Sequence, residues 1–485
     1  MAIVIVTTER ARVQMTDLDR VFSHIDKNFP DHLSKIQDYL KHPCFSTENF
    51  GVRECVDYLK SILGDLGFAG IEAVEGEVNP VVYGEYDAGA ERTLLVYAKY
   101  DNVGVEGQKW TYDPFQATIA EKLPFGRCIF ARGAHGGHAQ PRAFLNALES
   151  IEKTNAKLPV NLIFVAEGDE ELGSPSLPGF VEKYQTKLKK AEAMFSPGAS
   201  NQNEDGIVRI SLGTTGILRI GLECAGARWE KGPREFDIHP SSSPIVNNPL
   251  WHMIKCLASF VSEDENNALI DGFYDDAKGP SPEEDELLNQ LAGKFNLEKE
   301  KQVRGAIHEF VNGEKNPKVL LTRLLYRPSI YVTNLILRSS VIPHNVLAEV
   351  VIRTKPDQSS EKMMVILRRH LDRNGYSDIT IKRLSGYEPY RVDPCERIVR
   401  ATIKAYERIG VHPEIWPTNG GDPLAIFGNS PLELPSLGNV APVHGSGGHA
   451  PDEYMVVEGK HPYLGLRELE KGYASLLYEY ASPDS

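Results

Sequence analysis

The stretch NLIFVAEGDEELGS (residues 161–174) joins a hydrophobic run of buried-strand type to four carboxylates within five residues. In a sheet of parallel strands, functional side chains collect at the carboxyl ends of the strands, which is where these acids fall. Carboxylates this close repel one another, so we expect raised pKa values or a nearby cation. The adjacent pair Glu170 and Glu171 is suited to divide two roles, one as general base and one as metal ligand. A solvated acidic turn is the alternative interpretation.

Three further segments place reactive side chains after a predicted strand or in a glycine-rich loop. Imidazole, ammonium and carboxylate groups in such positions are candidates for proton transfer, charge stabilisation or metal binding, although polar turn residues have the same composition. They are Lys99 and Asp101 in RTLLVYAKYDNV (92–103), His135 and His138 in ARGAHGGHAQ (131–140), and His449 in VHGSGGHAPDEYM (443–455).

Hydrophobic periodicity predicts an α/β fold. Buried-type runs at 92–100 and 160–168 alternate with amphipathic helical segments at 51–68 and 141–155. This alternation favours a mixed, mostly parallel sheet flanked by helices. A helical pattern over 17–41 contains Pro30, and we expect the helix to break there.

From residue 211 the pattern changes to β-rich runs with interleaved helices, and helix–strand alternation resumes near residue 388. We therefore expect an α/β domain in two pieces, residues 1–210 and 388–485. An inserted α+β domain, residues 211–387, is expected to interrupt it.

Composition restricts the class of protein. The net charge of −14 argues against binding to nucleic acid, which requires clustered Lys and Arg. The apolar run at the N-terminus, MAIVIV, is too short for a signal peptide, and no stretch has the length of a membrane span. We expect a cytoplasmic protein without membrane contact. Its six scattered cysteines are expected to be reduced and mostly buried.

Several segments, in order along nearly the whole chain, resemble the M20 metallopeptidase family of carboxypeptidases, dipeptidases and N-acyl amino acid deacylases. The resemblance implies a catalytic domain with paired metals, two zinc ions being the family norm, and an inserted lid domain that mediates homodimerisation. The segments that carry it are YAKYDNV (97–103), WTYDPFQATIAEKLPFGRCIFARGA (110–134), EGDEELGS (167–174), FDIHPSSSPIVNNP (236–249) and GGHAPDE (447–453).

The resemblance assigns roles to four residues. Glu170 stands at the position of the general base, and Glu171 and His449 stand at positions of metal ligands. His239 matches a lid histidine that reaches the active site of a neighbouring subunit.

Other family positions are changed here. Lys99 stands where the first histidine ligand is expected, Gly136 where the bridging aspartate is expected, and His138 where the motif has lysine. A carboxylate ligand is replaced near Pro197. The substrate-side arginine is also absent from PTNGGDP (417–423), which predicts a less anionic ligand. Three of five metal-ligand positions are therefore lost.

Three interpretations follow. In the first, Lys99 replaces the charge of the metal, beside Glu170 and Glu171, and the chemistry is independent of metal. In the second, His135 and His138 join Glu171 and His449 around one zinc or manganese ion. In the third, catalysis is lost and the fold binds a ligand or partner.

The sequence thus predicts a hydrolase of an amide, peptide-like or acylated small molecule, with a non-standard site. The alternatives are an inactive binding protein, or a lyase, isomerase or condensing enzyme on the same fold. The expected cofactor is one zinc or manganese ion, or none, and the expected partner is a second copy of the chain. The proposed site residues are Glu170, Lys99, Asp101 and His239 for catalysis, Asn419, Gly420, Gly421 and His138 for substrate binding, and Glu171, His449, His135 and His138 for a rewired metal site.

Overall fold

A six-stranded mixed sheet organises the catalytic domain in the computed structural model, which describes residues 16–263, 267–336, 341–418 and 423–483. Its strand order is β1-β2-β6-β3-β7-β16. The last four strands run parallel, and β1 and β2 are antiparallel to their neighbours, as predicted. The strands are β1 (Ala69–Val74), β2 (Val81–Tyr86), β3 (Thr93–Lys99), β6 (Asn161–Glu167), β7 (Ala193–Phe195) and β16 (Ser436–Leu437).

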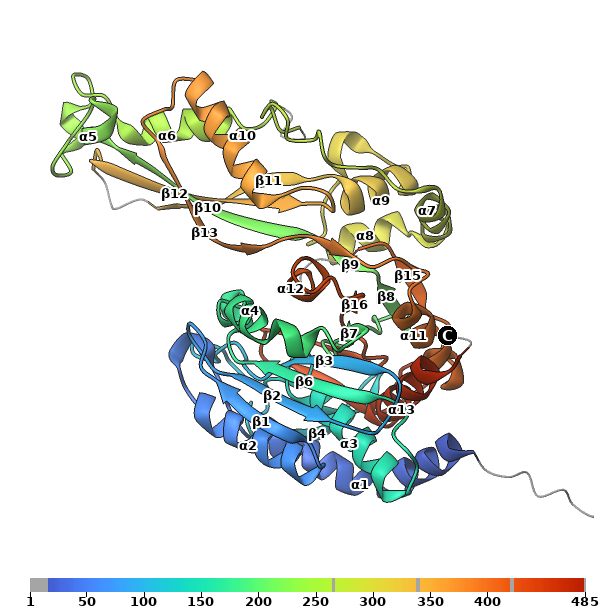
Figure 1. Cartoon of the computed structure of the whole chain (residues 1–485). Helices are drawn as coiled ribbons and strands as arrows, with labels where there is room; N and C mark the ends of the chain where they lie inside the picture. The colour runs from blue at the N-terminus through green and yellow to red at the C-terminus, as the bar shows by residue number, and fades with distance from the viewer. Residues whose placement is uncertain (1–15, 264–266, 337–340, 419–422, 484–485) are drawn as a thin grey trace, which may run out of the picture.

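Helices cover both faces of this sheet, with α1, α2 and α3 on one side and α4 on the side of the inserted domain (Figure 1). Central strand residues such as Leu94, Val96 and Phe164 are fully buried as a result. Strands buried on both faces read as continuous apolar runs, which is why the sequence revealed them. The helices are α1 (Asp17–Leu40), α2 (Val52–Asp65), α3 (Ala139–Lys153), α4 (Ser176–Leu188), α11 (Arg397–Arg408), α12 (Ala425–Gly428) and α13 (Leu466–Ala481).

The prediction that the first helix breaks at Pro30 was wrong, because α1 continues through this residue to Leu40. A proline inside a helix removes one backbone hydrogen bond and crowds the preceding turn. Here the apolar stripe continues on both sides of the proline, with Ile25 and Phe29 before it and Leu33 after it, all buried in the main core. Packing of that stripe outweighs the local preference.

A second, antiparallel sheet of order β17-β18-β5-β4 supports two loops of the site. β5 pairs with β18, so that Phe130 lies opposite Tyr454. The loop that follows β5 and the loop that precedes β18 therefore lie at the same end of this sheet. The strands are β4 (Thr118–Lys122), β5 (Gly126–Phe130), β17 (Gly445–Ser446) and β18 (Tyr454–Gly459).

The inserted domain has an antiparallel sheet of order β11-β12-β10-β13, and α6 and α10 pack on one of its faces (Figure 1). α7, α8 and α9 lie at one end of the domain. The elements are β10 (Gly216–Ala225), α5 (Gly226–Trp229), α6 (Pro249–Ala258), α7 (Pro282–Lys294), α8 (Leu297–Val303), α9 (Pro317–Tyr326), β11 (Ser329–Ile336), β12 (Asn345–Thr354), α10 (Ser360–Arg373) and β13 (Thr380–Tyr387).

Short paired strands connect the two domains. β9 (Gly213–Thr214), just before β10, pairs antiparallel with β14 (Tyr390–Arg391), just after β13. β8 (Arg209–Ser211) pairs in parallel with β15 (Glu414–Trp416). The chain therefore leaves the catalytic domain and returns to it at one place.

The six cysteines are free and five of them are buried, as predicted, with Cys395 exposed. No helix in the described part of the chain is long and apolar enough to cross a membrane.

A buried polar network joins α1, α3 and α13. One carboxylate oxygen of Glu470 lies 2.7 Å from Nδ1 of His32, and the other accepts a 2.8 Å hydrogen bond from Asn146. All three side chains are essentially inaccessible to solvent. Removing one partner from such a network leaves the others desolvated and unpaired.

We predict that Glu470→Ala lowers the free energy of unfolding by about 3–5 kcal/mol, because it removes the buried carboxylate with which both His32 and Asn146 pair. Urea unfolding followed by circular dichroism measures the change. The matched control is Glu152→Ala on the exposed face of α3, expected to change stability by less than about 0.5 kcal/mol. Equal effects of the two substitutions would contradict a stabilising role for the network.

Candidate functional site

The site forms where β3 and β6 end side by side. Lys99, the last residue of β3, is the ladder partner of Glu167, the last residue of β6. After Glu167 the chain turns back in a short 3₁₀ helix, Glu170–Leu172, closed by Gly173 at a φ of 90°. This turn brings Glu170 and Glu171 over the end of β3. Parallel pairing of adjacent strands is thus what unites two sequence segments about 70 residues apart.

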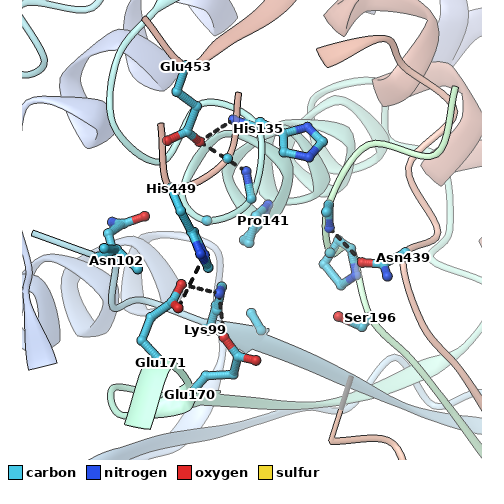
Figure 2. A pocket seen from close by; sticks show the side chains of 18 of the residues that line it. Lys99, Asn102, His135, Pro141, Glu170, Glu171, Ser196, Asn439, His449 and Glu453 are labelled. Carbon is cyan, nitrogen blue, oxygen red and sulfur yellow. Dashed lines mark hydrogen bonds and ion pairs between the residues drawn. The ribbon is translucent and has the colours of Figure 1, made fainter. Parts of the chain in front are cut away.

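Lys99 lies between two carboxylates (Figure 2). Its ammonium group donates to Oε2 of Glu170 and, at 2.7 Å, to Oε1 of Glu171. Burial opposes the charge on Lys99, but the negative charges of Glu170, Glu171 and Asp101 raise its pKa well above the ordinary value. The cation expected beside this acidic run is therefore the side chain of Lys99, which stays protonated.

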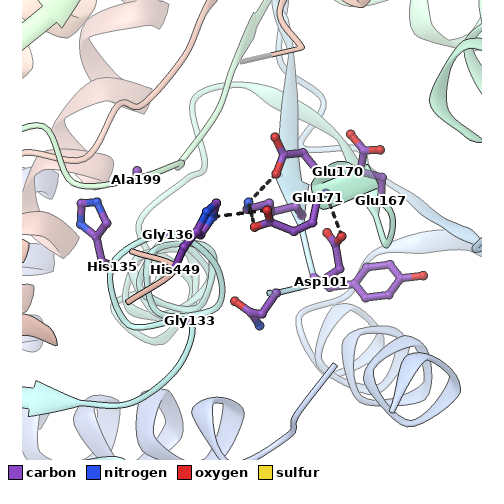
Figure 3. A network of polar contacts seen from close by, with 12 residues as sticks. Asp101, Gly133, His135, Gly136, Glu167, Glu170, Glu171, Ala199 and His449 are labelled. Carbon is purple, nitrogen blue, oxygen red and sulfur yellow. Dashed lines mark hydrogen bonds and ion pairs between the residues drawn. The ribbon is translucent and has the colours of Figure 1, made fainter. Parts of the chain in front are cut away.

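Asp101 lies beneath this pair and is fully buried. Its Oδ2 accepts the backbone N–H of Glu171 at 3.0 Å (Figure 3), whereas Oδ1 has no hydrogen-bond partner among the described residues. Burial raises the pKa of Asp101 to about 7, although the nearby Lys99 lowers it. Asp101 thus positions the turn that carries Glu171.

His449 completes the cluster from the loop between β17 and β18. Its Nε2 lies 3.3 Å from Oε2 of Glu171, and its backbone is in the left-handed region at a φ of 65°. The contact with Glu171 raises the pKa of His449. Burial alone would raise the pKa of Glu171, but His449 and Lys99 lower it to about 2. An ionised Glu171 therefore lies between Lys99 and His449.

The other two acids of the run hold the turn itself. Glu167 is buried and accepts hydrogen bonds from Tyr97 and, at 2.9 Å, from Ser174, and burial raises its pKa well above the ordinary value. Asp169 accepts from the hydroxyl of Ser176 and lies outside the cavity. The acidic run therefore divides into two structural carboxyls and two that face Lys99.

The two histidines of ARGAHGGHAQ are separated from the Lys99 cluster and from each other. His138 is buried, stacks on Tyr39 at 4.2 Å between ring centroids, and has Nε2 2.9 Å from the carbonyl oxygen of Tyr100. His135 lies on the far side of His449 from Glu171 (Figures 2 and 3), with Nδ1 2.7 Å from Oγ of Ser200. Burial, chiefly, lowers the pKa of each imidazole to about 4.

Glu453 holds the loop that carries His135. One of its carboxylate oxygens accepts the N–H of His135 at 2.7 Å and that of Gly136 at 3.3 Å. The other accepts from Gly133 at 3.2 Å and from the buried guanidinium of Arg132 at 2.7 Å. Glu453 stands in the same candidate segment as His449, but the sequence analysis gave it no role.

These residues line a cavity of about 340 Å³. Lys99, Glu170, Glu171, His135 and His449 reach its wall. The predicted residues His138, Asp101 and His239 do not line it, and Asn419, Gly420 and Gly421 lie outside the described residues. His239 is exposed on the inserted domain, where Nδ1 accepts the N–H of Ser241.

A second cavity, of about 610 Å³, shares His135 and Asn439 with the first and extends to the inserted domain. Arg353 and Lys355, at the end of β12, line it. Lys355 is buried, donates at 3.0 Å to the carbonyl of Leu324, and has its pKa lowered to about 8 by burial and by Arg353. No carboxylate of the described residues forms an ion pair with either cation. Sequence analysis missed both, because VVIRTKP resembles an ordinary strand end.

The described residues of the catalytic domain contain no three His, Cys, Asp or Glu ligand atoms that all lie within 4.8 Å of one another. The ligand set proposed for a rewired site, namely Glu171, His449, His135 and His138, is therefore dispersed. Only Glu171 and His449 are in contact among these four.

Comparison with known proteins agrees with this architecture. The model of the peptidase family M20/M25/M40 matches residues 95–473, so the chain belongs to that family, and the resemblance seen in the sequence is confirmed. The Cys-Gly metallodipeptidase DUG1 of Candida albicans is 23% identical over 441 residues, which cover 84% of this chain and 87% of the relative. The Beta-Ala-His dipeptidase of Homo sapiens is 23% identical over 367 residues, covering 72% and 68%.

Solved structures match over almost the whole chain. The M20 family metallo-carboxypeptidase Sso-CP2 from Sulfolobus solfataricus superposes with a TM-score of 0.81 and 27% identity, covering 93% of this chain and 99% of that structure. Human carnosine dipeptidase 1 superposes with a TM-score of 0.76 and 19% identity, covering 96% and 99%. The predicted combination of an α/β catalytic domain and an inserted α+β domain is the fold of this family.

We predict that Glu453→Gln increases the rate of amide hydrogen exchange at His135 and Gly136 and lowers the free energy of unfolding by about 3–5 kcal/mol. The substitution removes the charge that pairs with the buried Arg132 and weakens the acceptor for the loop amides. Hydrogen exchange followed by mass spectrometry measures the first effect.

The control is Asp452→Asn, because Asp452 accepts from Thr111 and Tyr112 instead of this loop. Unchanged exchange at His135 in Glu453→Gln would show that Glu453 does not hold the loop.

Proposed function

We propose that the protein hydrolyses an amide bond in a short peptide or N-acyl amino acid, with the ammonium group of Lys99 in the place of a catalytic metal. The observation that carries the proposal is that Lys99 is held by both Glu170 and Glu171 in the wall of the cavity. The reaction class is supported by the family and by the dipeptidase names of the relatives.

The metallodipeptidase names of relatives imply metal ions, and the residues present here do not fit a pair of them. Each zinc requires about four ligands, and a bridging carboxylate normally holds two ions together. The available carboxylate oxygens of Glu171 already contact Lys99 and His449. A cation at Lys99 also repels a divalent ion placed beside it.

The proposed chemistry uses side chains and no metal ion. Glu170 accepts a proton from the attacking water and returns it to the leaving nitrogen. An ammonium group has three hydrogens, and Lys99 uses two of them on Glu170 and Glu171, which leaves one for the oxygen of the scissile carbonyl. Glu171 and His449 keep Lys99 in place.

The second cavity supports an anionic group on the substrate. Arg353 and Lys355 lie without a carboxylate partner among the described residues, in a protein whose net charge is −14. Cations kept unpaired in a cleft favour an incoming carboxylate or similar anion. This differs from the less anionic ligand that the PTNGGDP segment suggested, because the cations come from β12 instead.

The inserted domain also supports a homodimer. β11 is an edge strand whose side chains are largely exposed, among them Tyr331, Val332 and Ile336, each at least 40% exposed. An edge strand with exposed apolar side chains is a surface suited to association with a second copy. We infer that His239, which lies outside the cavity of its own chain, reaches the cavity of the partner subunit in this dimer.

We predict that the wild-type enzyme hydrolyses members of a panel of dipeptides and N-acyl amino acids equally well before and after treatment with a metal chelator. Glu170→Gln is expected to lower kcat on the order of 10²–10⁴-fold with little change in substrate binding, because it removes the general base. Product release followed by mass spectrometry measures turnover, and calorimetry measures binding. Loss of turnover on chelation, with the fold and substrate binding unchanged and with activity restored by zinc, would overturn the metal-free proposal.

A double substitution that reintroduces metal-ligand side chains tests whether Lys99 stands in the place of a metal ion. Lys99→His combined with Gly136→Asp restores two family ligand types, and a Cβ at Gly136 meets no atom within 4 Å. This double variant is expected to bind zinc at the site and to become sensitive to the chelator. Absence of turnover in the wild type across the panel, with ligand binding retained, would favour a binding protein.

We predict that kcat/KM for an anionic substrate falls as pH rises through about 8 and that Lys355→Arg extends the plateau to higher pH. The pKa of Lys355 is lowered to about 8, so its positive charge is present below this pH and lost above it. Lys355→Met should remove this limb of the profile and raise KM about tenfold. The control is the same substrate with its C-terminal carboxylate replaced by an amide. If kcat/KM for the amide shows the same pH dependence and the same change in Lys355→Met, an anion subsite is contradicted.

A further inference from the structure

A second cluster of metal-ligating side chains lies in the inserted domain, outside both cavities described above. Cys224 is near the end of β10, His252 is in the first half of α6, and Asp378 precedes β13. Their sulfur, nitrogen and carboxylate ligand atoms all lie within 4.8 Å of one another. Three separate segments of the domain thus converge on one point.

We propose that Cys224, His252 and Asp378 bind a structural zinc ion. A thiolate, an imidazole and a carboxylate are the three ligand types that zinc takes in proteins, whereas magnesium and calcium require oxygen ligands. The charge also fits, since one thiolate and one carboxylate neutralise a divalent cation. Nothing in this proposal depends on the reaction at Lys99.

The spacing of the atoms is close to that of a zinc shell. Nε2 of His252 lies 3.0 Å from Oδ1 and 3.1 Å from Oδ2 of Asp378. Two ligands of a tetrahedral zinc with bonds of 2.0–2.1 Å stand about 3.3 Å apart. The imidazole of His252 and the carboxylate of Asp378 therefore need to move little to bind zinc. The sulfur of Cys224 would have to move closer to them.

The imidazole ring is held in a fixed plane. Trp229 stacks on His252 with 4.2 Å between ring centroids and 16° between planes, and Tyr376 approaches it at 5.1 Å. A ligand whose orientation is fixed by packing loses little conformational entropy when it binds a metal. The side chains of His252 and Asp378 are 11% and 13% exposed, which leaves a narrow path for the ion.

Cys256 is the candidate for the fourth position, and its sulfur would have to move, because it is not part of the group whose ligand atoms all lie within 4.8 Å of one another. Cys256 follows His252 by four residues, one helical turn, and is fully buried in the same core cluster as Cys224. Arg368 is close enough for its positive charge to act on Cys256, although it also pairs with Asp372 at 2.7 Å. A Cys₂HisAsp set would close the tetrahedron without water.

The test uses the full-length protein, purified without a metal-binding tag and dialysed with zinc. Metal analysis is expected to find one zinc per chain, and cobalt in its place should give a cobalt–thiolate charge-transfer absorption. Cys224→Ser and Asp378→Asn should each weaken zinc binding at least tenfold and abolish the thiolate band or shift it. Cys128→Ser, a buried thiol of the catalytic domain, is the matched control and should retain both signals.

Absence of stoichiometric zinc in the wild type, or zinc retained with unchanged affinity in Cys224→Ser, would overturn the proposal. Circular dichroism of each variant establishes that loss of zinc does not follow from loss of the fold. Glu171→Gln separates this site from the catalytic one, because it removes a catalytic-domain carboxylate and should leave the zinc of the inserted domain in place.

Discussion

One ammonium group, that of Lys99, keeps two neighbouring carboxylates together at the carboxyl edge of the catalytic sheet. Without a cation there, Glu170 and Glu171 would repel each other and a turn of this shape would be strained electrostatically. The ammonium removes that repulsion from within the chain. A metal ion would supply a similar charge, but from solution and with a demand for several ligands.

The rest of the structure positions this contact. Parallel pairing of β3 and β6 places Lys99 beside Glu167, and the buried Asp101 fixes the turn that carries Glu171. On the opposite side, Glu453 fixes the loop of His135 through its backbone amides. Two carboxylates that accept backbone N–H groups, Asp101 and Glu453, thus fix the loops on either side of the cavity. Such charge-assisted bonds are short and directional, which gives a well-defined cavity between loops.

Much of the fold and part of the site were readable from the sequence. Apolar runs buried on both faces predicted the sheet, and the acidic run after β6 together with Lys99 predicted the central contact. The prediction from local pattern was wrong where tertiary packing outweighs local preference, as at Pro30, through which α1 continues. The imidazoles of His135 and His138 stand three residues apart in the chain, yet the turn directs one to Ser200 and the other to Tyr100. Spacing alone carries no information about such directions.

The pairing of strands β9 and β14 bears on how the inserted domain can change in evolution. Because Gly213 and Arg391 are ladder partners, the two ends of the intervening segment lie next to each other. A whole domain therefore occupies the position of a simple surface turn in the catalytic unit. Such an arrangement allows the intervening module to be gained, lost or exchanged while the strands of the core keep their register. The part that supplies Arg353 and Lys355 can thus diverge in its sequence without altering the part that holds Lys99.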